Sequence, residues 1–329
     1  MNRRQFVQSG LLAFAAPMAM ADTSPWRSAA PIPINTQELY PAVHQGRLYV
    51  AGGIAAKLGV PYFTNACYSY DHKRDEWRAE ADLPMDLHHA ALVSTGQQLF
   101  LVGGFNGAYT HTWRMQSAVY ELTTEGWQAQ TALPAPQAEG VLSTASDGAI
   151  HLVTGQSPRG EANSKRSDHR EVVNHWRWQP GDSRWLEAAP IPTPRNSATG
   201  GWYGDQLIVS GGRTARGNLS ETEIYDARED KWRSAAPLPL PQAGTAGAMS
   251  DEGLIVFGGE IFQPRADVFK EVWHYRFSSD SWEALADMPT PRHGNGAGRI
   301  GNDIYVIGGA TKPGGSGTSN LNEVYALGS

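Results

Sequence analysis

Charged side chains that could bind an acidic ligand recur in this chain at two kinds of place. One place directly follows a pair of glycines, and the other follows a proline that closes a short apolar segment. The planar guanidinium of arginine matches a carboxylate with two parallel hydrogen bonds. Arginines beside a lone carboxylate therefore favour the capture of an acidic small molecule. In the second half of the chain these residues are Arg195, Arg213, Glu260, Arg265 and Arg292, and the corresponding places earlier hold His88, His89, Asn106 and Glu139.

Two of these arginines, Arg195 and Arg292, follow a proline and have a second interpretation. Each could form an ion pair with a neighbouring part of the fold instead of contacting a ligand. Gln137 and Gln242 occupy equivalent places elsewhere in the chain, so the fold does not demand arginine there. Both interpretations stay open. His88, in the same way, is either a ligand-binding residue or part of a polar rim.

Six tryptophans show which elements must position these residues. Each is followed six and seven residues later by an apolar residue and a proline, and they recur at intervals of roughly 50 residues. Agreement at three offsets in every copy identifies an internal repeat. The tryptophans are Trp26, Trp77, Trp127, Trp185, Trp232 and Trp282.

Each repeat predicts four short β-strands. An apolar run rich in Val, Ile and Leu ends in Gly-Gly, which is typical of a buried strand closed by a turn that needs a positive φ. An aromatic residue seven positions before the tryptophan marks the next strand, and the tryptophan marks the one after it. A Gly- and Ala-rich stretch after the proline supplies the innermost strand, where strands crowd around an axis. Six such antiparallel sheets predict a ring of blades.

The two ends of the chain predict how the ring closes. Trp26 has no apolar run before it, and the last run has its aromatic, Tyr325, but no tryptophan after it. The segment from Trp26 to Ile32 should therefore be the fourth strand of the last blade, which removes a free sheet edge. In such a blade, the residues after Gly-Gly and those after the apolar-proline pair share one face. The candidate binding residues are thus expected around one mouth of the ring.

The repeat resembles the kelch repeat, in which Gly-Gly, then Tyr, then Trp recur in each blade of about 50 residues. The resemblance covers nearly all of residues 22–329. It implies one all-β domain, a six-bladed kelch β-propeller whose last blade is closed by the N-terminal strand. Thr154-Gly155 and Trp178 depart from the pattern in the third blade, although the spacing is kept.

Composition argues against some classes of function. The formal charge of −6 argues against nucleic-acid binding, which requires a basic surface. No apolar span of about 18 residues follows the N-terminal segment, so no membrane helix is expected. Cys67 is the single cysteine, and it is either a buried inert thiol or a reactive nucleophile.

Residues 1–21 are typical of an export signal. Arg3-Arg4-Gln5-Phe6 precedes an apolar stretch, and Ala19-Met20-Ala21 fits a cleavage site. The paired arginines resemble a twin-arginine signal, which implies the twin-arginine export machinery as a partner and a periplasmic or secreted location. An ordinary secretory signal is the alternative. No cysteine follows the cleavage site, so no lipid anchor is expected.

Exported six-bladed kelch proteins of this size resemble the N-acetylneuraminate epimerases, or sialic acid mutarotases. That family uses a glutamate and an arginine after the turn that ends the second strand of a blade, and Glu260 with Arg265 is similar in form. The resemblance implies Glu260 as the base for the anomeric hydroxyl of a sugar acid, and Arg265 or His88 as a donor or orienting group. No metal and no cofactor are required. The sugar carboxylate would be held by Arg195, Arg213 or Arg292.

Two other functions remain open. A kelch ring can be a binding module without catalysis that recognises a protein or a glycan, since a fold does not fix a function. Galactose oxidases also use kelch propellers, and a copper site of that kind would need His and Tyr ligands and a Tyr–Cys crosslink near the axis. Cys67 is expected in an outer strand of the first blade, away from the mouth. An isomerase and a binding module are therefore the two main hypotheses.

Overall fold

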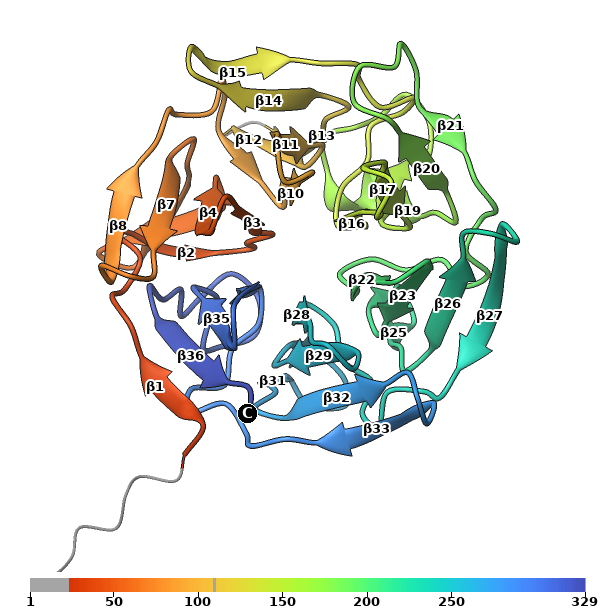
Figure 1. The fold of residues 1–329 in the computed structure, drawn as a ribbon. Coiled ribbons are helices and arrows are strands. Elements are labelled where there is room, and N and C mark those ends of the chain that lie inside the picture. The colour runs from red at the N-terminus through yellow and green to blue at the C-terminus, as the bar shows by residue number, and fades with distance from the viewer. Residues whose placement is uncertain (1–23, 109–110, 329) are drawn as a thin grey trace, which may run out of the picture.

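A computed structural model describes residues 24–108 and 111–328 of the chain, and the predicted export signal, residues 1–21, lies outside them. The described residues form six four-stranded antiparallel sheets, arranged as blades around a central axis (Figure 1). This arrangement confirms the predicted all-β propeller. No helix in the described part is long and apolar enough to cross a membrane.

In each blade the first strand lies nearest the axis and the fourth lies at the outer rim. Blade one holds β3 (Ala42–His44), β4 (Arg47–Ala51), β7 (Cys67–Asp71) and β8 (Glu76–Ala79). Blade two holds β10 (Ala91–Ser94), β11 (Leu99–Val102), β14 (Val119–Thr123) and β15 (Gly126–Ala129). Blade three holds β16 (Val141–Thr144), β17 (Ile150–Val153), β20 (His175–Trp178) and β21 (Leu186–Glu187). Blade four holds β22 (Thr199–Tyr203), β23 (Gln206–Ser210), β26 (Thr222–Asp226) and β27 (Lys231–Ala235). Blade five holds β28 (Ala246–Met249), β29 (Leu254–Phe257), β32 (Val272–Arg276) and β33 (Ser281–Ala284). Blade six holds β34 (Gly296–Ile300), β35 (Asp303–Ile307), β36 (Asn322–Ala326) and, from the N-terminal segment, β1 (Trp26–Ser28).

The Gly-Gly pairs are required by contacts between neighbouring blades. The N–H of Gly53 donates to the carbonyl of Leu87 in the next blade at 2.8 Å, and the N–H of Gly259 donates to that of Arg292 at 2.8 Å. A Cβ on the preceding glycine of each pair would overlap the same carbonyl oxygen. Only a residue without a side chain fits that approach at a positive φ.

In blade three, Thr154 takes the place of the first glycine at this contact, and it has a φ of 56°. Its hydroxyl lies 2.7 Å from the carbonyl oxygen of Arg195 and accepts the Arg195 N–H at 3.0 Å. The hydroxyl therefore turns a steric conflict into hydrogen bonds, which explains how the repeat tolerates threonine at this place.

The six repeat tryptophans join each blade to the one before it. Every indole N–H donates to the backbone carbonyl that lies four residues after the preceding tryptophan of the ring. Because the contact is the same in each blade, the tryptophan spacing follows directly from the circular packing. The six bonds are Trp77 to Ala30 (2.8 Å), Trp127 to Ala81 (2.9 Å), Trp185 to Thr131 (3.0 Å), Trp232 to Ala189 (2.8 Å), Trp282 to Ala236 (2.8 Å) and Trp26 to Ala286 (3.1 Å).

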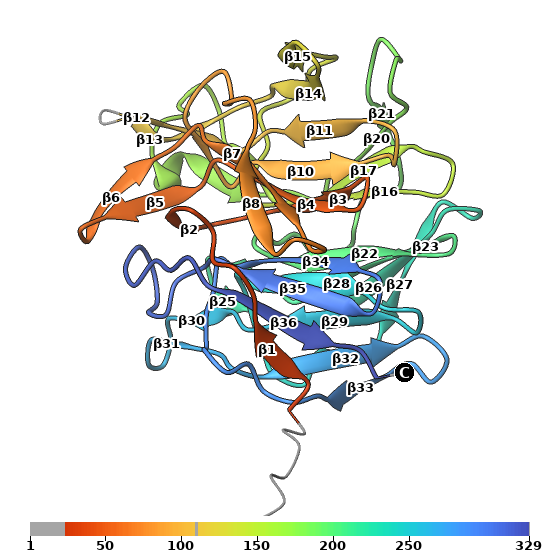
Figure 2. The same cartoon turned by 60° about the vertical axis from the view of Figure 1, so that its left-hand side comes forward.

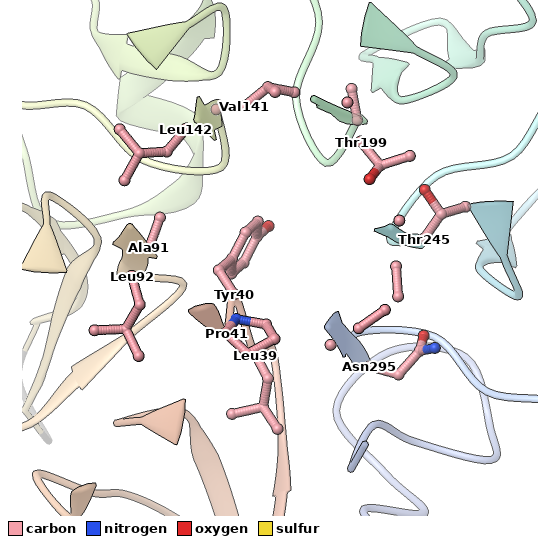
Figure 3. Close-up of a pocket in the computed structure, with 17 residues that line it drawn as sticks. Leu39, Tyr40, Pro41, Ala91, Leu92, Val141, Leu142, Thr199, Thr245 and Asn295 are labelled. Atoms are coloured by element: carbon pink, nitrogen blue, oxygen red, sulfur yellow. The ribbon is translucent and has the colours of Figure 1, made fainter. Parts of the chain in front are cut away.

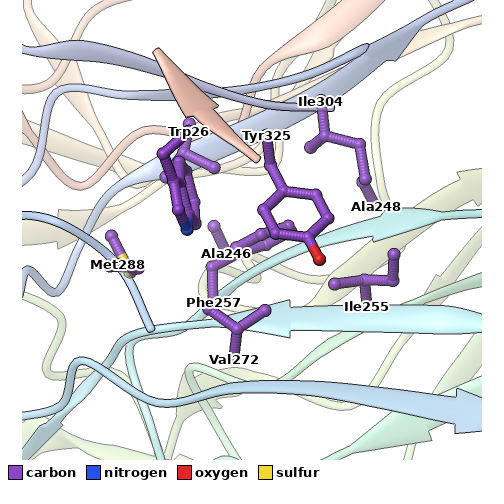
Figure 4. Packing of buried hydrophobic residues seen from close by; sticks show 10 residues of the cluster. Trp26, Ala246, Ala248, Ile255, Phe257, Val272, Met288, Ile304 and Tyr325 are labelled. Atoms are coloured by element: carbon purple, nitrogen blue, oxygen red, sulfur yellow. The ribbon is translucent and has the colours of Figure 1, made fainter. Parts of the chain in front are cut away.

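The ring closes as predicted, through β1 and β36. Trp26 pairs with Tyr325 in antiparallel register, and Figure 2 shows β1 running beside β36. The Trp26 ring lies 5.0 Å from that of Tyr325 and 5.9 Å from that of Phe257, both edge-on (Figure 4). The N-terminal strand thus buries a large aromatic side chain between blades five and six.

Short sheets cover one end of the ring, called the mouth below (Figure 2). They pair residues that follow Gly-Gly with residues that follow the proline or with the returning chain. Both kinds of place therefore meet on one face. The elements are β2 (Asn35–Gln37), β5 (Ile54–Lys57), β6 (Val60–Phe63), β9 (Leu87–His88), β12 (Phe105–Ala108), β13 (His111–Met115), β18 (Gln156–Pro158), the 3-10 turn η1 (Arg166–Asp168), β19 (His169–Glu171), β24 (Arg213–Thr214), β25 (Gly217–Asn218), β30 (Glu260–Ile261) and β31 (Asp267–Val268).

The innermost strands of blades two to six, together with residues 39–41 before β3 of blade one, enclose a cavity of about 130 Å³ on the axis. Figure 3 shows Tyr40 reaching into it from the segment before β3. Away from the axis, Cys67 on β7 is buried, and burial raises the pKa of its thiol to about 12. The thiol is therefore protonated at neutral pH, as expected for an inert core residue.

Candidate functional site

Six residues, one from each blade, occupy equivalent places at the mouth. Each precedes the innermost strand of its blade and has a φ between 53° and 65°. The N–H of Ser197 donates to the carbonyl of Glu139 at 3.1 Å, and the N–H of Gly244 donates to that of Ser197 at 2.9 Å. Such a φ costs a residue other than glycine about 1–3 kcal/mol, so the charged side chains are kept here against a backbone preference. The six are Glu38, His89, Glu139, Ser197, Gly244 and Gly294.

Charged side chains at these places form a buried group, the mouth cluster, with residues from the short sheets and with His293. His89 Nε2 lies 3.1 Å from Glu38 Oε2 and 3.3 Å from Glu139 Oε1. The side chains of His89 and Glu139 are 3% and 0% exposed. Coulombic attraction is stronger here than at a wet surface because little water screens it. The cluster consists of Glu38, His89, Glu139, Arg213, Glu260 and His293.

The hydrogen bonds around His88 define the direction of its contact with His89. The carbonyl of Thr112 can only accept, so His88 carries a proton on Nε2, 2.7 Å away. Burial, followed by the neighbouring His89, lowers the pKa of His88 to about 3, which leaves its Nδ1 as an acceptor. His89 must then donate from Nδ1 across 2.7 Å, while its Nε2 faces two carboxylates.

Glu260 is the second centre of the cluster. Its Oε1 accepts from Arg213 Nη1 at 2.7 Å, and its Oε2 accepts from the N–H of Gly314 at 2.8 Å. His293 Nδ1 lies 3.4 Å from Oε2. The side chain of Glu260 is 2% exposed, so its charge is compensated inside the protein.

The cluster affects nearby titrations. Although burial opposes the charged form of Glu38, His89, His293 and Arg213 together hold the pKa of its carboxyl well below the usual range. Tyr40 lies beneath the same carboxylates, and burial together with the charges of Glu139 and Glu38 raises the pKa of its phenol well above 10. The mouth cluster thus sets the electrostatic environment of Glu38 and Tyr40.

An open cleft, called the arginine cleft below, lies beside the mouth cluster. Its volume is about 520 Å³, and it runs between the mouth loops of blades three, four and five. Three arginines line it together with Phe262, a residue that is 46% exposed. The guanidinium of Arg213 lies 5.5 Å from the Phe262 ring, and that of Arg166 lies 4.8 Å from Trp113. The polar residues of the lining include Arg159, Arg166, Arg213, Gln156, His169, Glu171 and Asn196.

Comparisons with known proteins fit this architecture. The model of the kelch motif matches residues 41–84 and 194–239. The chain carries kelch repeats. It is 27% identical over 183 residues to Kelch-like protein terF of Aspergillus terreus, 28% identical over 139 residues to mouse Kelch-like protein 35, and 25% identical over 190 residues to human Kelch repeat and BTB domain-containing protein 12. The matches cover 54%, 42% and 54% of this chain but 39%, 22% and 30% of the relatives.

Two predicted binding residues, Arg195 and Arg292, belong to the scaffold of the kelch ring. Both side chains are 0% exposed and pair with Glu223 and Glu323. Arg195 also donates to the carbonyls of Gly211 and Glu221, and Arg292 donates to that of Val306. The ion-pair interpretation therefore describes them, because their guanidinium groups face into the blades and not into the mouth.

The structure separates Glu260 from Arg265. Glu260 pairs with Arg213, whereas Arg265 is exposed in the turn between β30 and β31. The contact between a glutamate and an arginine is thus made between two blades, by Glu260 and Arg213, and not within one loop. Of the remaining predicted residues, His88 lies stacked between Phe63 and Phe105, and Asn106 donates to the carbonyl of Asp86 at 3.0 Å.

The sequence indicates His89 and Glu139 as candidates but gives no reason to prefer Glu38 and His293, which complete the mouth cluster. All four lie in the short segments after the prolines. In its own blade, each of them lies one or two residues after the repeat position that Arg195 and Arg292 occupy in theirs. Arg159 and Arg166 come from the long loop of blade three, where the pattern of the repeat gives no guidance. Among the described residues, no group of three or more His, Cys, Asp or Glu side chains is arranged to hold a metal ion.

Proposed function

We propose that this protein is a non-catalytic kelch binding module that takes a carboxylate-bearing segment of a protein partner into the arginine cleft. The observation that carries the proposal is the convergence of Arg159, Arg166 and Arg213 on one open cavity. Arginine forks bind carboxylates with charge-assisted hydrogen bonds. An exposed aromatic ring, Phe262, adds an apolar wall of the kind that anchors binding partners.

The mouth cluster supports this proposal by holding the cleft rigid. Arg213 is fixed on one side by Glu260, and Arg166 reaches within 3.6 Å of Glu139. A guanidinium that is held in place loses less conformational entropy when a ligand binds. The curated relatives are named for kelch repeats and a BTB domain, and not for a reaction.

A binding measurement tests the proposal. An acetylated tetraglutamate peptide with a free carboxyl terminus should bind, and the matching tetraglutamine amide should not. Replacing Arg159 and Arg166 together by alanine should weaken binding at least tenfold, equivalent to about 1.4 kcal/mol. Arg228→Ala is the matched control, because Arg228 is exposed and pairs with Asp205 far from the cleft. Equal affinities for the two peptides, or for both variants, would overturn the proposal.

A second candidate function is mutarotation of a sugar acid such as N-acetylneuraminic acid. The contact between Glu260, His293 and Arg213 favours it, because these groups supply a base, an acid and a cation at the mouth. Interconversion of the two anomers can be followed by NMR with and without the protein. Glu260→Gln should abolish any acceleration, and a rate equal to that in buffer would remove this candidate.

We also propose that residues 1–21 direct twin-arginine export to the periplasm. The motif Arg3-Arg4-Gln5-Phe6 supports this location. In a bacterial host with that pathway, replacing both arginines by lysine should retain the protein in the cytoplasmic fraction. Unchanged export of the lysine variant would favour an ordinary secretory signal.

A further inference from the structure

One polar group in the arginine cleft, the amide oxygen of Gln156, has no partner of its own. Glu171 Oε1 lies 3.3 Å from Gln156 Nε2 and 3.0 Å from Asn196 Nδ2. An ionised carboxylate only accepts hydrogen bonds, so it fixes the NH₂ side of both amides toward itself. Gln156 Oε1 then points away, and no donor in the described part of the chain reaches it. Gln156 is 6% exposed and lines the cleft.

A second unsatisfied group, a donor, lines the same cleft. Arg213 gives Nη1 to Glu260 and Nη2 to the hydroxyl of Ser197, while its buried Nε has no acceptor among the described residues. A buried polar group without a partner costs about 1–3 kcal/mol, so a ligand that satisfies it is favoured. Two residues that line the cleft, from neighbouring mouth loops, therefore hold one unsatisfied acceptor and one unsatisfied donor.

These two groups distinguish among carboxylates. The carboxylate of an aspartate or glutamate side chain is attached to a CH₂ group, which offers Gln156 nothing to accept. An α-hydroxy or α-amido carboxylate carries an O–H or N–H on the carbon that bears the carboxylate. Such a group can accept from arginine and donate to the amide oxygen at the same time.

We propose that the arginine cleft selects carboxylates that have a hydrogen-bond donor on the adjacent carbon. Gln156 is the residue that accepts a hydrogen bond from this donor. This inference rests on the proposed function, since it uses the same cleft. The donor can belong to a free hydroxy acid or to the last residue of a peptide. Phe262 borders the cleft and covers the apolar part of either ligand.

Matched small acids test the donor. Lactate and propionate differ by one hydroxyl, and N-acetylalanine and its amide differ by the carboxylate. Binding is measured by titration of backbone and side-chain amide signals in ¹H–¹⁵N NMR spectra. Lactate should bind at least fivefold more tightly than propionate and should shift the Gln156 side-chain signal, while propionate should not. N-acetylalanine should bind and its amide should not.

Variants separate this inference from the proposed function. Gln156→Leu should bring lactate down to the affinity of propionate and leave propionate unchanged, and Gln128→Leu, on the exposed edge strand β15, should change neither. Equal binding of lactate and propionate, lost in Arg166→Ala, would overturn the inference but keep the carboxylate cleft. No binding of any acid would overturn both. A preference for lactate over N-acetylalanine would identify free acids as the source, and the reverse would identify peptide termini.

Discussion

Two arginine–glutamate pairs show how a single side chain becomes part of the scaffold in this ring. Arg292 Nη1 donates to Glu323 Oε2 at 2.5 Å, and Thr290 Oγ1 donates to Glu323 Oε1 at 2.8 Å. Desolvation lowers the pKa of Arg292 from its usual value, although Glu323 opposes that shift. A buried pair of this kind contributes little net stability, but removing one member leaves an uncompensated charge.

Replacing Arg292 should therefore destabilise the protein more than its modest net contribution implies. We expect Arg292→Met to lower the free energy of unfolding by about 3–5 kcal/mol, measured by urea denaturation. The double variant Arg292→Met/Glu323→Leu should regain most of that loss, because no buried charge remains. If the double variant is no more stable than the single one, the loss reflects packing and not the stranded carboxylate.

The elements of this fold could be predicted because each signal is local. Gly-Gly, the following aromatic and the tryptophan lie within one repeat, and the tryptophan makes the same hydrogen bond in every blade. The mouth cluster could not be predicted in this way. Glu260 meets Arg213, and Glu38 meets His89 and approaches His293, so the site depends on how blades lie next to one another. Whether an arginine turns inward to a glutamate, as Arg195 does, depends on a partner in another strand that no spacing reveals.

The closing strand β1 is the element on which the ring depends most. Trp26 is 8% exposed and packs on Phe257 and Tyr325, while its indole N–H bonds to Ala286. We expect Trp26→Ala to lower the free energy of unfolding by about 3–5 kcal/mol, as for other buried large-to-small changes. Trp26→Phe keeps much of the apolar contact and loses the hydrogen bond, so it should cost less.

Arg265→Ala is the control for the closing strand, because Arg265 is exposed in a turn and should change stability by no more than about 0.5 kcal/mol. Thermal unfolding followed by circular dichroism gives the comparison. Equal melting temperatures for the Trp26 and Arg265 variants would mean that β1 does not hold the last blade.

At the scale of the whole molecule, buried neutral histidines make stability depend on pH. Burial, with His175 and Arg177 nearby, lowers the pKa of His151 to about 3, and burial lowers the pKa of His175 to about 4. His151 Nδ1 lies 2.8 Å from His175 Nε2, and His175 Nδ1 lies 3.1 Å from the carbonyl of Ala189. One proton on each imidazole satisfies this chain of hydrogen bonds, so a second proton on either imidazole has no acceptor inside the protein.

The direction in which stability changes with pH follows from proton uptake on unfolding. The unfolded histidines take up protons below their ordinary pKa of 6.5, whereas His88, His151 and His175 in the folded ring do so only near pH 3–4. Below pH 6.5 the unfolded chain therefore binds more protons than the folded ring. The free energy of unfolding is highest above pH 6.5 and falls as the pH falls toward 4, by up to about 1.4 kcal/mol per pH unit for each histidine. The lowered pKa of Glu38 acts in the same direction below its usual value of 4.5.

Urea denaturation at a series of pH values should therefore show stability falling between pH 6.5 and 4, with His151→Gln showing a shallower slope because one proton fewer is taken up. His72→Gln is the control, since His72 lies in the turn between β7 and β8 and outside the buried histidine chain. A curve that stays flat down to pH 4.5 would mean that these histidines take up protons in the folded ring at the same pH as in the unfolded chain.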